Sequence, residues 1–229
     1  MHFVLFKLPR TGSSSLGMAL NTGDSFCRNE ILNHWNPAVH GPSQACIDAV
    51  LATASTRIRG FTLNPFKAPQ VAPDFWSFPE GAAHDRLVVL LRRDPWPATV
   101  SRMICGHMGV FPGNSADAKA GAVQAKVRGG MRIDPPTFLA AYRQAMRNDE
   151  RLQEFARDYA ERHAAPLCVV RYEKVFGEDA TDLHALEAAL GCRVDRQYLA
   201  PALKILPDDG RAFMINFAEL EHAVNEARP

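Results

Sequence analysis

Two segments of this 229-residue chain place arginine and hydroxyl side chains directly after an apolar stretch. Residues 2–8 lead into the sequence Pro9-Arg10-Thr11-Gly12-Ser13-Ser14. Residues 87–91 lead to Arg93 and, eight residues later, to Ser101. Guanidinium groups and hydroxyls are hydrogen-bond donors that suit the oxygens of phosphate and sulfate. Each segment therefore predicts a site for an anion.

The first segment has the pattern of a strand, a tight loop and a helix that continues over Ser15–Leu20. The N–H groups that open a helix lack partners and carry partial positive charge, which suits a phosphate. Gly12 would let the backbone approach the ligand, Ser13 and Ser14 would add hydroxyl donors, and Arg10 would hold two oxygens at once. An ordinary polar turn with a serine cap is the alternative. The chain lacks the string G-x-x-x-x-G-K-[ST], which disfavours a kinase of the P-loop type.

The second segment predicts a strand end that turns into a helix. Two prolines, Pro95 and Pro97, favour a helix start, and we expect the helix over Ala98–Ile104. Arg93 at the strand end and Ser101 on the first turns could then converge on one anion. The alternative is a surface arginine paired to its neighbouring aspartate, with a serine that has no ligand.

Strands and helices alternate along the chain and must position these residues. Four short apolar runs predict strands, and longer amphipathic stretches predict helices between them. We expect strands at His2–Leu8, Arg59–Leu63, Leu87–Leu91 and Leu167–Arg171, and helices at Ser43–Thr53, Pro136–Ala164 (one helix or two), Thr181–Leu190 and Ala218–Ala227. This alternation predicts an α/β fold with a mostly parallel sheet covered on both faces, which binds ligands at the carboxyl ends of its strands.

Length and composition set the remaining bounds. The length suits a single domain over residues 1–229. A net charge of +1 gives no reason to expect nucleic acid as a partner. The five cysteines form no C-x-x-C pair, so we expect reduced thiols in the cytoplasm. The first apolar run is too short for a signal peptide or a transmembrane helix. The eight histidines show no metal-ligand spacing, and we expect no metal.

Together the two segments resemble the sulfotransferases that use 3′-phosphoadenosine-5′-phosphosulfate (PAPS). The first signature of that family reads P-[KR]-[ST]-G-[ST]-[ST], and the second is an apolar strand followed by R-[ND]-P and a serine eight residues after the arginine. The chain has both in this order. Weaker similarities are Val169–Glu173, like the late strand of the family that ends in Y-E, and Ile215–Leu220, like the I-x-N-x-x-E-L run of bacterial carbohydrate sulfotransferases.

The resemblance implies a fold, a donor and roles for the residues. The fold would be a P-loop-like three-layer α/β/α domain. PAPS would be the sulfuryl donor, and no metal would take part. The acceptor would be a hydroxyl, on a carbohydrate or a lipid-linked sugar. The residues that bind the 5′-phosphosulfate would be Arg10, Thr11, Gly12, Ser13 and Ser14, and those that hold the 3′-phosphate would be Arg93 and Ser101.

The resemblance also suggests a general base. The bacterial branch places a catalytic glutamate about where Glu30 stands, and Arg10 would act beside it on the transferred group. His34 is the second candidate for the base and His40 the third, since imidazole titrates near neutral pH. Aromatic side chains could line an acceptor groove or belong to the core: Trp35, Phe66, Phe75, Trp76 and Phe78. The late R-K-G element of the cytosolic animal enzymes is absent, with Gly210-Arg211 as a possible substitute.

Three other functions stay open at this point. A nucleotide-dependent phosphotransferase with a degenerate loop would need a lysine in the loop and an acidic magnesium ligand, for which Asp94 is the candidate. A non-catalytic relative would keep the residues that bind the nucleotide but would lack the general base. An interaction protein without a ligand would have to carry two separate anion motifs by chance.

Overall fold

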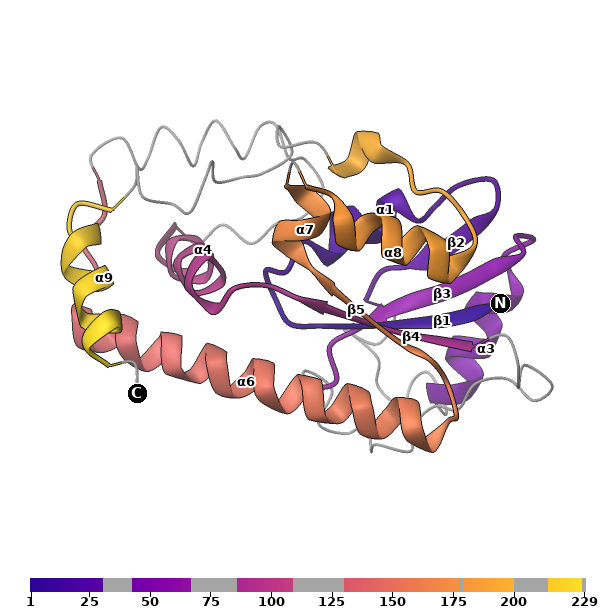
Figure 1. Ribbon diagram of the computed structural model, residues 1–229, viewed down its shortest axis with the longest axis horizontal. Coiled ribbons are helices and arrows are strands. Elements are labelled where there is room, and N and C mark those ends of the chain that lie inside the picture. The colour runs from indigo at the N-terminus through magenta and orange to yellow at the C-terminus, as the bar shows by residue number, and fades with distance from the viewer. Residues whose placement is uncertain (31–42, 67–85, 109–129, 178, 200–213, 228–229) are drawn as a thin grey trace. The chain divides into compact units, whose positions relative to one another are not determined.

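The computed structural model describes residues 1–30, 43–66, 86–108, 130–177, 179–199 and 214–227 (Figure 1). The chain divides into two compact units. The first comprises residues 1–92 and 150–199, and the second comprises residues 93–149 and 200–229. Each unit buries apolar side chains of its own. The single domain expected over residues 1–229 stays a prediction.

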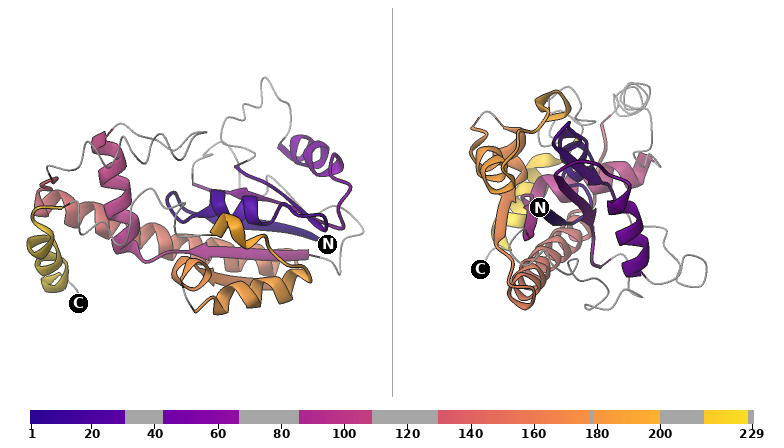
Figure 2. Two further views of the ribbon diagram at one scale, coloured as in Figure 1. Left: turned by 90° about the horizontal axis from the view of Figure 1, so that it is seen from above. Right: turned by 90° about the vertical axis from the view of Figure 1, so that its right-hand side faces the viewer.

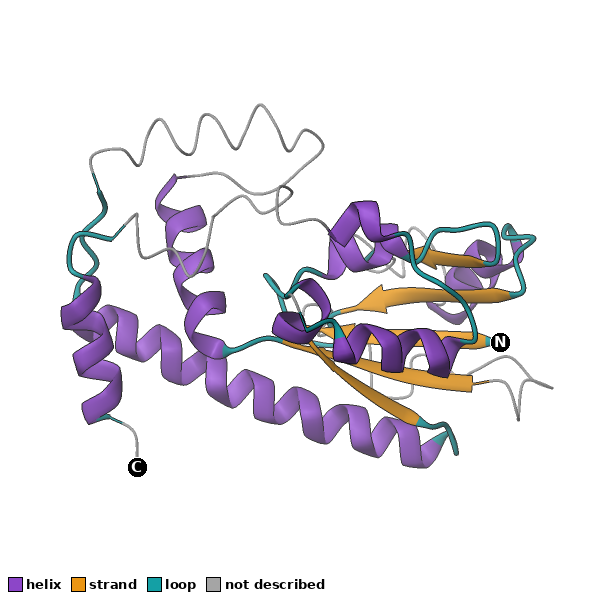
Figure 3. Ribbon diagram, turned by 45° about the horizontal axis from the view of Figure 1, so that its top comes forward, coloured by secondary structure: helices purple, strands orange, loops and turns teal. Residues whose placement is uncertain are grey.

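The first unit is built on a five-stranded sheet with the strand order β2-β3-β1-β4-β5 (Figure 3). Every pairing in it is parallel, which confirms the α/β fold and the parallel sheet. The strands are β1 (His2–Lys7), β2 (Ser25–Arg28), β3 (Ile58–Leu63), β4 (Arg86–Arg92) and β5 (Leu167–Arg171). β1 lies at the centre and apolar side chains pack on both of its faces, so its apolar run is continuous.

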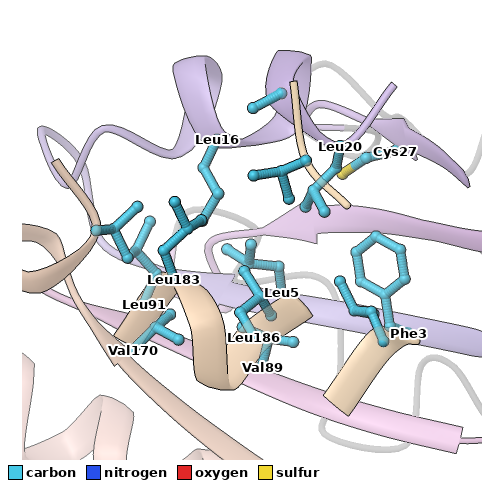
Figure 4. Close-up of a cluster of buried hydrophobic side chains, with 14 of the residues drawn as sticks. Phe3, Leu5, Leu16, Leu20, Cys27, Val89, Leu91, Val170, Leu183 and Leu186 are labelled. Atoms are coloured by element: carbon cyan, nitrogen blue, oxygen red, sulfur yellow. The ribbon is translucent and has the colours of Figure 1, made fainter. Parts of the chain in front are cut away.

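One face of the sheet packs against α1 (Ser13–Ala19), α7 (Tyr172–Phe176), α8 (Thr181–Leu190) and the short helix η1 (Arg196–Leu199). Side chains alternate along a strand, so Phe3 and Leu5 of β1 point to this face. They meet leucines from α1 and α8, as Figure 4 shows. The predicted helix over Thr181–Leu190 is confirmed, and Gly191 ends it in the left-handed conformation that a helix stop favours.

The opposite face packs against α3 (Ser43–Ala52) and the C-terminal part of α6 (Pro135–Arg162). Phe6 of β1 contacts the rings of Phe155 and Tyr159 edge to face, with both pairs of ring centroids 5.1 Å apart. Figure 2 shows α3 and α8 on opposite sides of the sheet. Helices thus cover both faces, as the sequence predicts. The stretch expected as one helix or two is one continuous helix, α6.

The second unit contains α4 (Pro95–Met108), the first part of α6 and α9 (Phe217–Glu226). Trp96 lies against three rings of this unit. Its centroid is 4.8 Å from that of Phe138, 5.4 Å from that of Phe217 and 6.4 Å from that of Tyr142. These aromatic contacts join the three helices around one apolar core.

Asn216 ties the start of α9 to the segment before α6. Its side chain is almost fully buried and makes two hydrogen bonds to the backbone of Ile133. The amide donates to the Ile133 carbonyl at 2.7 Å, and the Ile133 N–H donates to Oδ1 at 3.1 Å. Glu219, one turn later, accepts two hydrogen bonds from Arg132 at 2.9 Å and one from the Asn216 amide at 3.1 Å. Asn216 and Glu219 of the Ile215–Leu220 run therefore connect the start of α9 to the segment before α6.

None of the helices in the described ranges is both long enough and apolar enough to cross a membrane. All five cysteines lie in those ranges and are free thiols. Burial raises the pKa of Cys27, Cys168 and Cys192, so these thiols are held in the neutral form.

Arg171, at the end of β5, and Asp182, in the first turn of α8, form an ion pair that should make stability depend on acid. Asp182 accepts hydrogen bonds from the Arg171 backbone N–H at 2.8 Å and from its guanidinium at 2.9 and 3.1 Å. These bonds hold the pKa of Asp182 below its usual value. A carboxylate with a lowered pKa stabilises the fold above its unfolded pKa, about 3.9, and loses this effect as the pH falls through the folded pKa.

We therefore expect Asp182→Asn to be less stable than wild type at pH 6. The difference between their free energies of unfolding should become smaller from pH 4 downwards. Urea unfolding curves at pH 6, 4 and 3 give the two free energies of unfolding. Asp158→Asn, on the exposed side of α6, is the control and should stay close to wild type throughout. A difference for Asp182→Asn that is the same at all three pH values would contradict the expectation.

Candidate functional site

The predicted site residues of the first unit lie near the carboxyl ends of its parallel strands. The register pairs Phe6 with Leu63 and Lys7 with Leu91, so β1, β3 and β4 end side by side. β2 joins the same edge through Arg28, which pairs with Phe61. Ligands of such sheets bind at this edge. The loop after β1 and the turn after β2, which carries Glu30, both start there.

The loop between β1 and α1 is a tight turn closed by Thr11. Thr11 is buried, and its hydroxyl donates to the carbonyl of Leu8 at 2.8 Å. α1 begins at Ser13, which is also buried, while Ser14 is exposed. The sequence prediction of strand, loop and helix is confirmed. The Thr11 side chain holds the turn together, and its part in binding a cofactor stays a prediction.

Gly12 has the backbone of a left-handed residue, with φ of 75°. A Cβ there would lie 2.6 Å from the ring of Tyr172 and 3.0 Å from that of Phe176, which stack on each other with centroids 4.5 Å apart. Only glycine fits both this conformation and this contact without strain. α7, which follows β5, therefore forms the wall against which the loop packs.

Gly17 allows a second close approach, between α1 and the turn after β2. A Cβ on Gly17 would lie 2.0 Å from Oδ1 of Asn29. Asn29 donates a hydrogen bond to the carbonyl of Ser14 at 3.3 Å. The residue next to Glu30 is thus attached to the first turn of α1, which brings the predicted base and the predicted anion loop to one place.

Glu30 forms an ion pair with Lys7, the last residue of β1. The Lys7 side chain is 2% exposed and that of Glu30 is 31% exposed. The Glu30 backbone N–H donates to Oγ1 of Thr62, a fully buried residue of β3, at 2.8 Å. Lys7 was not predicted as a site residue. The signal in the sequence is a lysine that ends an otherwise apolar central strand.

Two predicted site residues have a strained backbone. Arg10, with φ of 69°, and Glu30, with φ of 49°, are two of the four non-glycine residues of positive φ in the described ranges. Such a conformation costs on the order of 1–3 kcal/mol and is concentrated at functional sites. This strain supports a functional role for the edge where both residues lie.

The second predicted anion site, formed by Arg93 and Ser101, belongs to the second unit, whereas Arg10 belongs to the first. α4 begins at Pro95, and Asp94 caps it, because the Trp96 N–H donates to Oδ1 of Asp94 at 2.8 Å. Ser101 is buried in α4 at 5% exposure. The strand-to-helix turn is confirmed. The binding of one nucleotide by Arg10 and Arg93 stays a prediction.

Several predicted residues lie outside the described residues: His34, Trp35, His40, Phe75, Trp76, Phe78, Gly210 and Arg211. Phe66 is described and packs against the core beneath α6, where the guanidinium of Arg151 lies 4.7 Å from its ring centroid. This placement favours the core role for Phe66 over the acceptor groove. Within the described ranges, no three His, Cys, Asp or Glu side chains come together as metal ligands.

No protein-family model matches the chain, and no curated protein matches it.

Proposed function

We propose that the chain is a sulfotransferase that moves a sulfuryl group from PAPS to an acceptor hydroxyl, with a P-loop-like arrangement of its sheet and loops. The observation that carries the proposal is the turn from Pro9 to Ser14 at the carboxyl end of the central strand. It combines a strained arginine, a left-handed glycine and hydroxyl side chains directly before α1. Glu30 lies at the same edge of the sheet.

In the proposed reaction the acceptor oxygen bonds to sulfur as the bond from sulfur to the bridging phosphate oxygen breaks. The acceptor proton passes to Glu30, and 3′,5′-adenosine bisphosphate leaves with the electron pair of the broken bond. Negative charge grows on the bridging oxygen. Fixed donors aimed at such an oxygen lower the barrier, and Arg10, Ser13 and Ser14 would supply them.

The other parts of the proposal concern binding. Arg93 and Ser101 would hold the 3′-phosphate, which distinguishes PAPS from ATP and ADP. His34 is the second candidate for the base. The acceptor would be a carbohydrate or a lipid-linked sugar. The free thiols agree with a cytoplasmic setting, which is part of the proposal.

The phosphotransferase alternative is less well supported. Its candidate magnesium ligand, Asp94, uses a carboxylate oxygen to cap α4. Its lysine would have to stand in the loop, and Lys7 instead ends β1 and is paired with Glu30. These contacts favour sulfuryl transfer.

The donor can be tested by a thermal shift with 3′,5′-adenosine bisphosphate and with ADP. A ligand at 100 times its dissociation constant adds about 2.7 kcal/mol to the free energy of unfolding, or roughly 5–10 °C for a chain of this size. We expect that shift with the bisphosphate at concentrations where ADP gives less than half of it. An equal shift with ADP would exclude PAPS as the preferred donor.

Arg93→Ala should remove the preference for the 3′-phosphorylated nucleotide, because the 3′-phosphate would lose its bidentate partner. The matched control is Arg102→Ala, which removes an exposed arginine of α4, the helix that follows Arg93, and should keep the preference. Both variants are measured by the thermal shift described above. A preference that survives in Arg93→Ala would show that another residue reads the 3′-phosphate.

A further inference from the structure

Lys7 is an unusual residue for its position in the sheet. It ends the central strand, where both faces are covered, and its side chain is 2% exposed. A buried ammonium is strongly unfavourable unless an anion compensates it. Here the ion pair with Glu30 does so.

The ion pair joins the end of β1 to the turn after β2, and these two strands are not neighbours in the sheet. Lys7 is in step with Phe3 and Leu5, so it belongs to the face of the sheet covered by α1. Thr62 pairs with Leu5 in the parallel register and lies on the same face of β3. Because β3 stands between β1 and β2, the contact from Lys7 to Glu30 crosses over the end of β3.

Glu30 is therefore fixed at two points. Thr62 accepts the hydrogen bond of its backbone N–H, and Lys7 pairs with its carboxylate. Both contacts hold it in a backbone conformation, φ of 49°, that a glutamate rarely adopts. The backbone contact fixes where the residue lies, and the ion pair fixes where its carboxylate points.

We propose that Lys7 is a positioning residue that holds the Glu30 carboxylate in a fixed orientation at the carboxyl edge of the sheet, so that it can take the proton of the acceptor. This inference rests on the proposed function. A general base must lie within hydrogen-bond reach of its proton, and a misplacement of about 1 Å can lower a rate about a hundredfold. A carboxylate accepts several hydrogen bonds, so an ion pair at one oxygen is compatible with that role.

The test uses Lys7→Met, which keeps most of the length of the side chain and removes its charge. Consumption of PAPS is measured as release of 3′,5′-adenosine bisphosphate, with water as the probe acceptor. We expect kcat to fall about tenfold to a hundredfold while KM for PAPS stays within about threefold. Lys7→Arg should recover at least half of the loss on a logarithmic scale. In Glu30→Gln, which has no base to hold, the further change Lys7→Met should leave kcat unaltered within about twofold.

The matched control is Lys174→Met, which removes a lysine of an exposed ion pair with Asp179 and should keep the wild-type kcat. If Lys7→Met is too unstable to purify, Lys7→Gln takes its place with the same expected fall in kcat. A lysine that only supported the fold would lower the melting temperature and leave kcat per folded molecule unchanged.

Failure of this inference can be separated from failure of the proposed function. If wild type neither prefers the bisphosphate over ADP nor consumes PAPS, the proposed function is wrong and the role of Lys7 falls with it. If wild type consumes PAPS and Lys7→Met does so equally fast, the positioning role alone is wrong. An equal fall in the Glu30→Gln background would also overturn it, because Lys7 would then act on something other than Glu30.

Discussion

Replacing Arg10 by alanine is expected to slow release of 3′,5′-adenosine bisphosphate from PAPS about a hundredfold. The proposed transition state places charge on the bridging oxygen, and loss of one donor aimed at such an oxygen raises the barrier by about 3 kcal/mol. Affinity for the bisphosphate should fall less, by about tenfold, because the loop amides and hydroxyls remain. The rate comes from single-turnover release of the bisphosphate, and the affinity from titration of the protein with it.

Two further variants separate the charge of Arg10 from its backbone. Arg10→Gly removes the same guanidinium and relieves the strain at φ of 69°, so it should be about as slow as Arg10→Ala yet more stable by about 1 kcal/mol. Arg157→Ala removes an exposed arginine of α6 and should react like wild type. A rate for Arg10→Ala within threefold of wild type would remove Arg10 from the reaction.

Asn216→Leu is expected to destabilise the second unit by roughly 2–5 kcal/mol. The substitution keeps the approximate size of the side chain but leaves the N–H and the carbonyl of Ile133 without their partner. Each buried group that loses its hydrogen bond costs about 1–3 kcal/mol. Urea unfolding, followed by tryptophan fluorescence, measures the loss.

Asn225→Leu serves as the comparison, because Asn225 is an exposed residue of the same helix. It should change the free energy of unfolding by no more than about 0.5 kcal/mol. If Asn216→Leu were equally mild, the two bonds to Ile133 would not be what joins α9 to the segment before α6.

The parts of the fold that the sequence predicts well are those whose burial leaves a local pattern. β1, β3 and β4 read as apolar runs because both faces of the sheet are covered. α8 has a glycine at its stop, and α4 has prolines at its start. These signals lie within a few residues of the elements they mark.

The parts that the sequence does not predict depend on contacts between distant residues. β2 has four residues, two of them polar, and is a strand because β3 pairs with it. The contact of Tyr172 with Gly12 and that of Lys7 with Glu30 both need the strand order, which no local pattern contains. The Asn216 side chain makes a hydrogen bond to Ile133, which lies 83 residues earlier in the chain. The loop after β1 could therefore be predicted from the sequence, whereas the contacts that hold it in place could not.

The central place of β1 has a consequence for synthesis of the chain on the ribosome. Phe3, Val4, Leu5 and Phe6 are fully buried in the finished sheet, but the neighbours of β1 are residues 58–63 and 86–92. Translation at roughly 5–20 residues per second delivers the first neighbour several seconds after β1 and the second later still. During that interval the apolar segment of β1 has no native partner. We expect nascent chains whose residues 58–63 have not yet left the ribosome to be bound by chaperones that recognise extended apolar segments, and those whose residues 86–92 have emerged to be released from them.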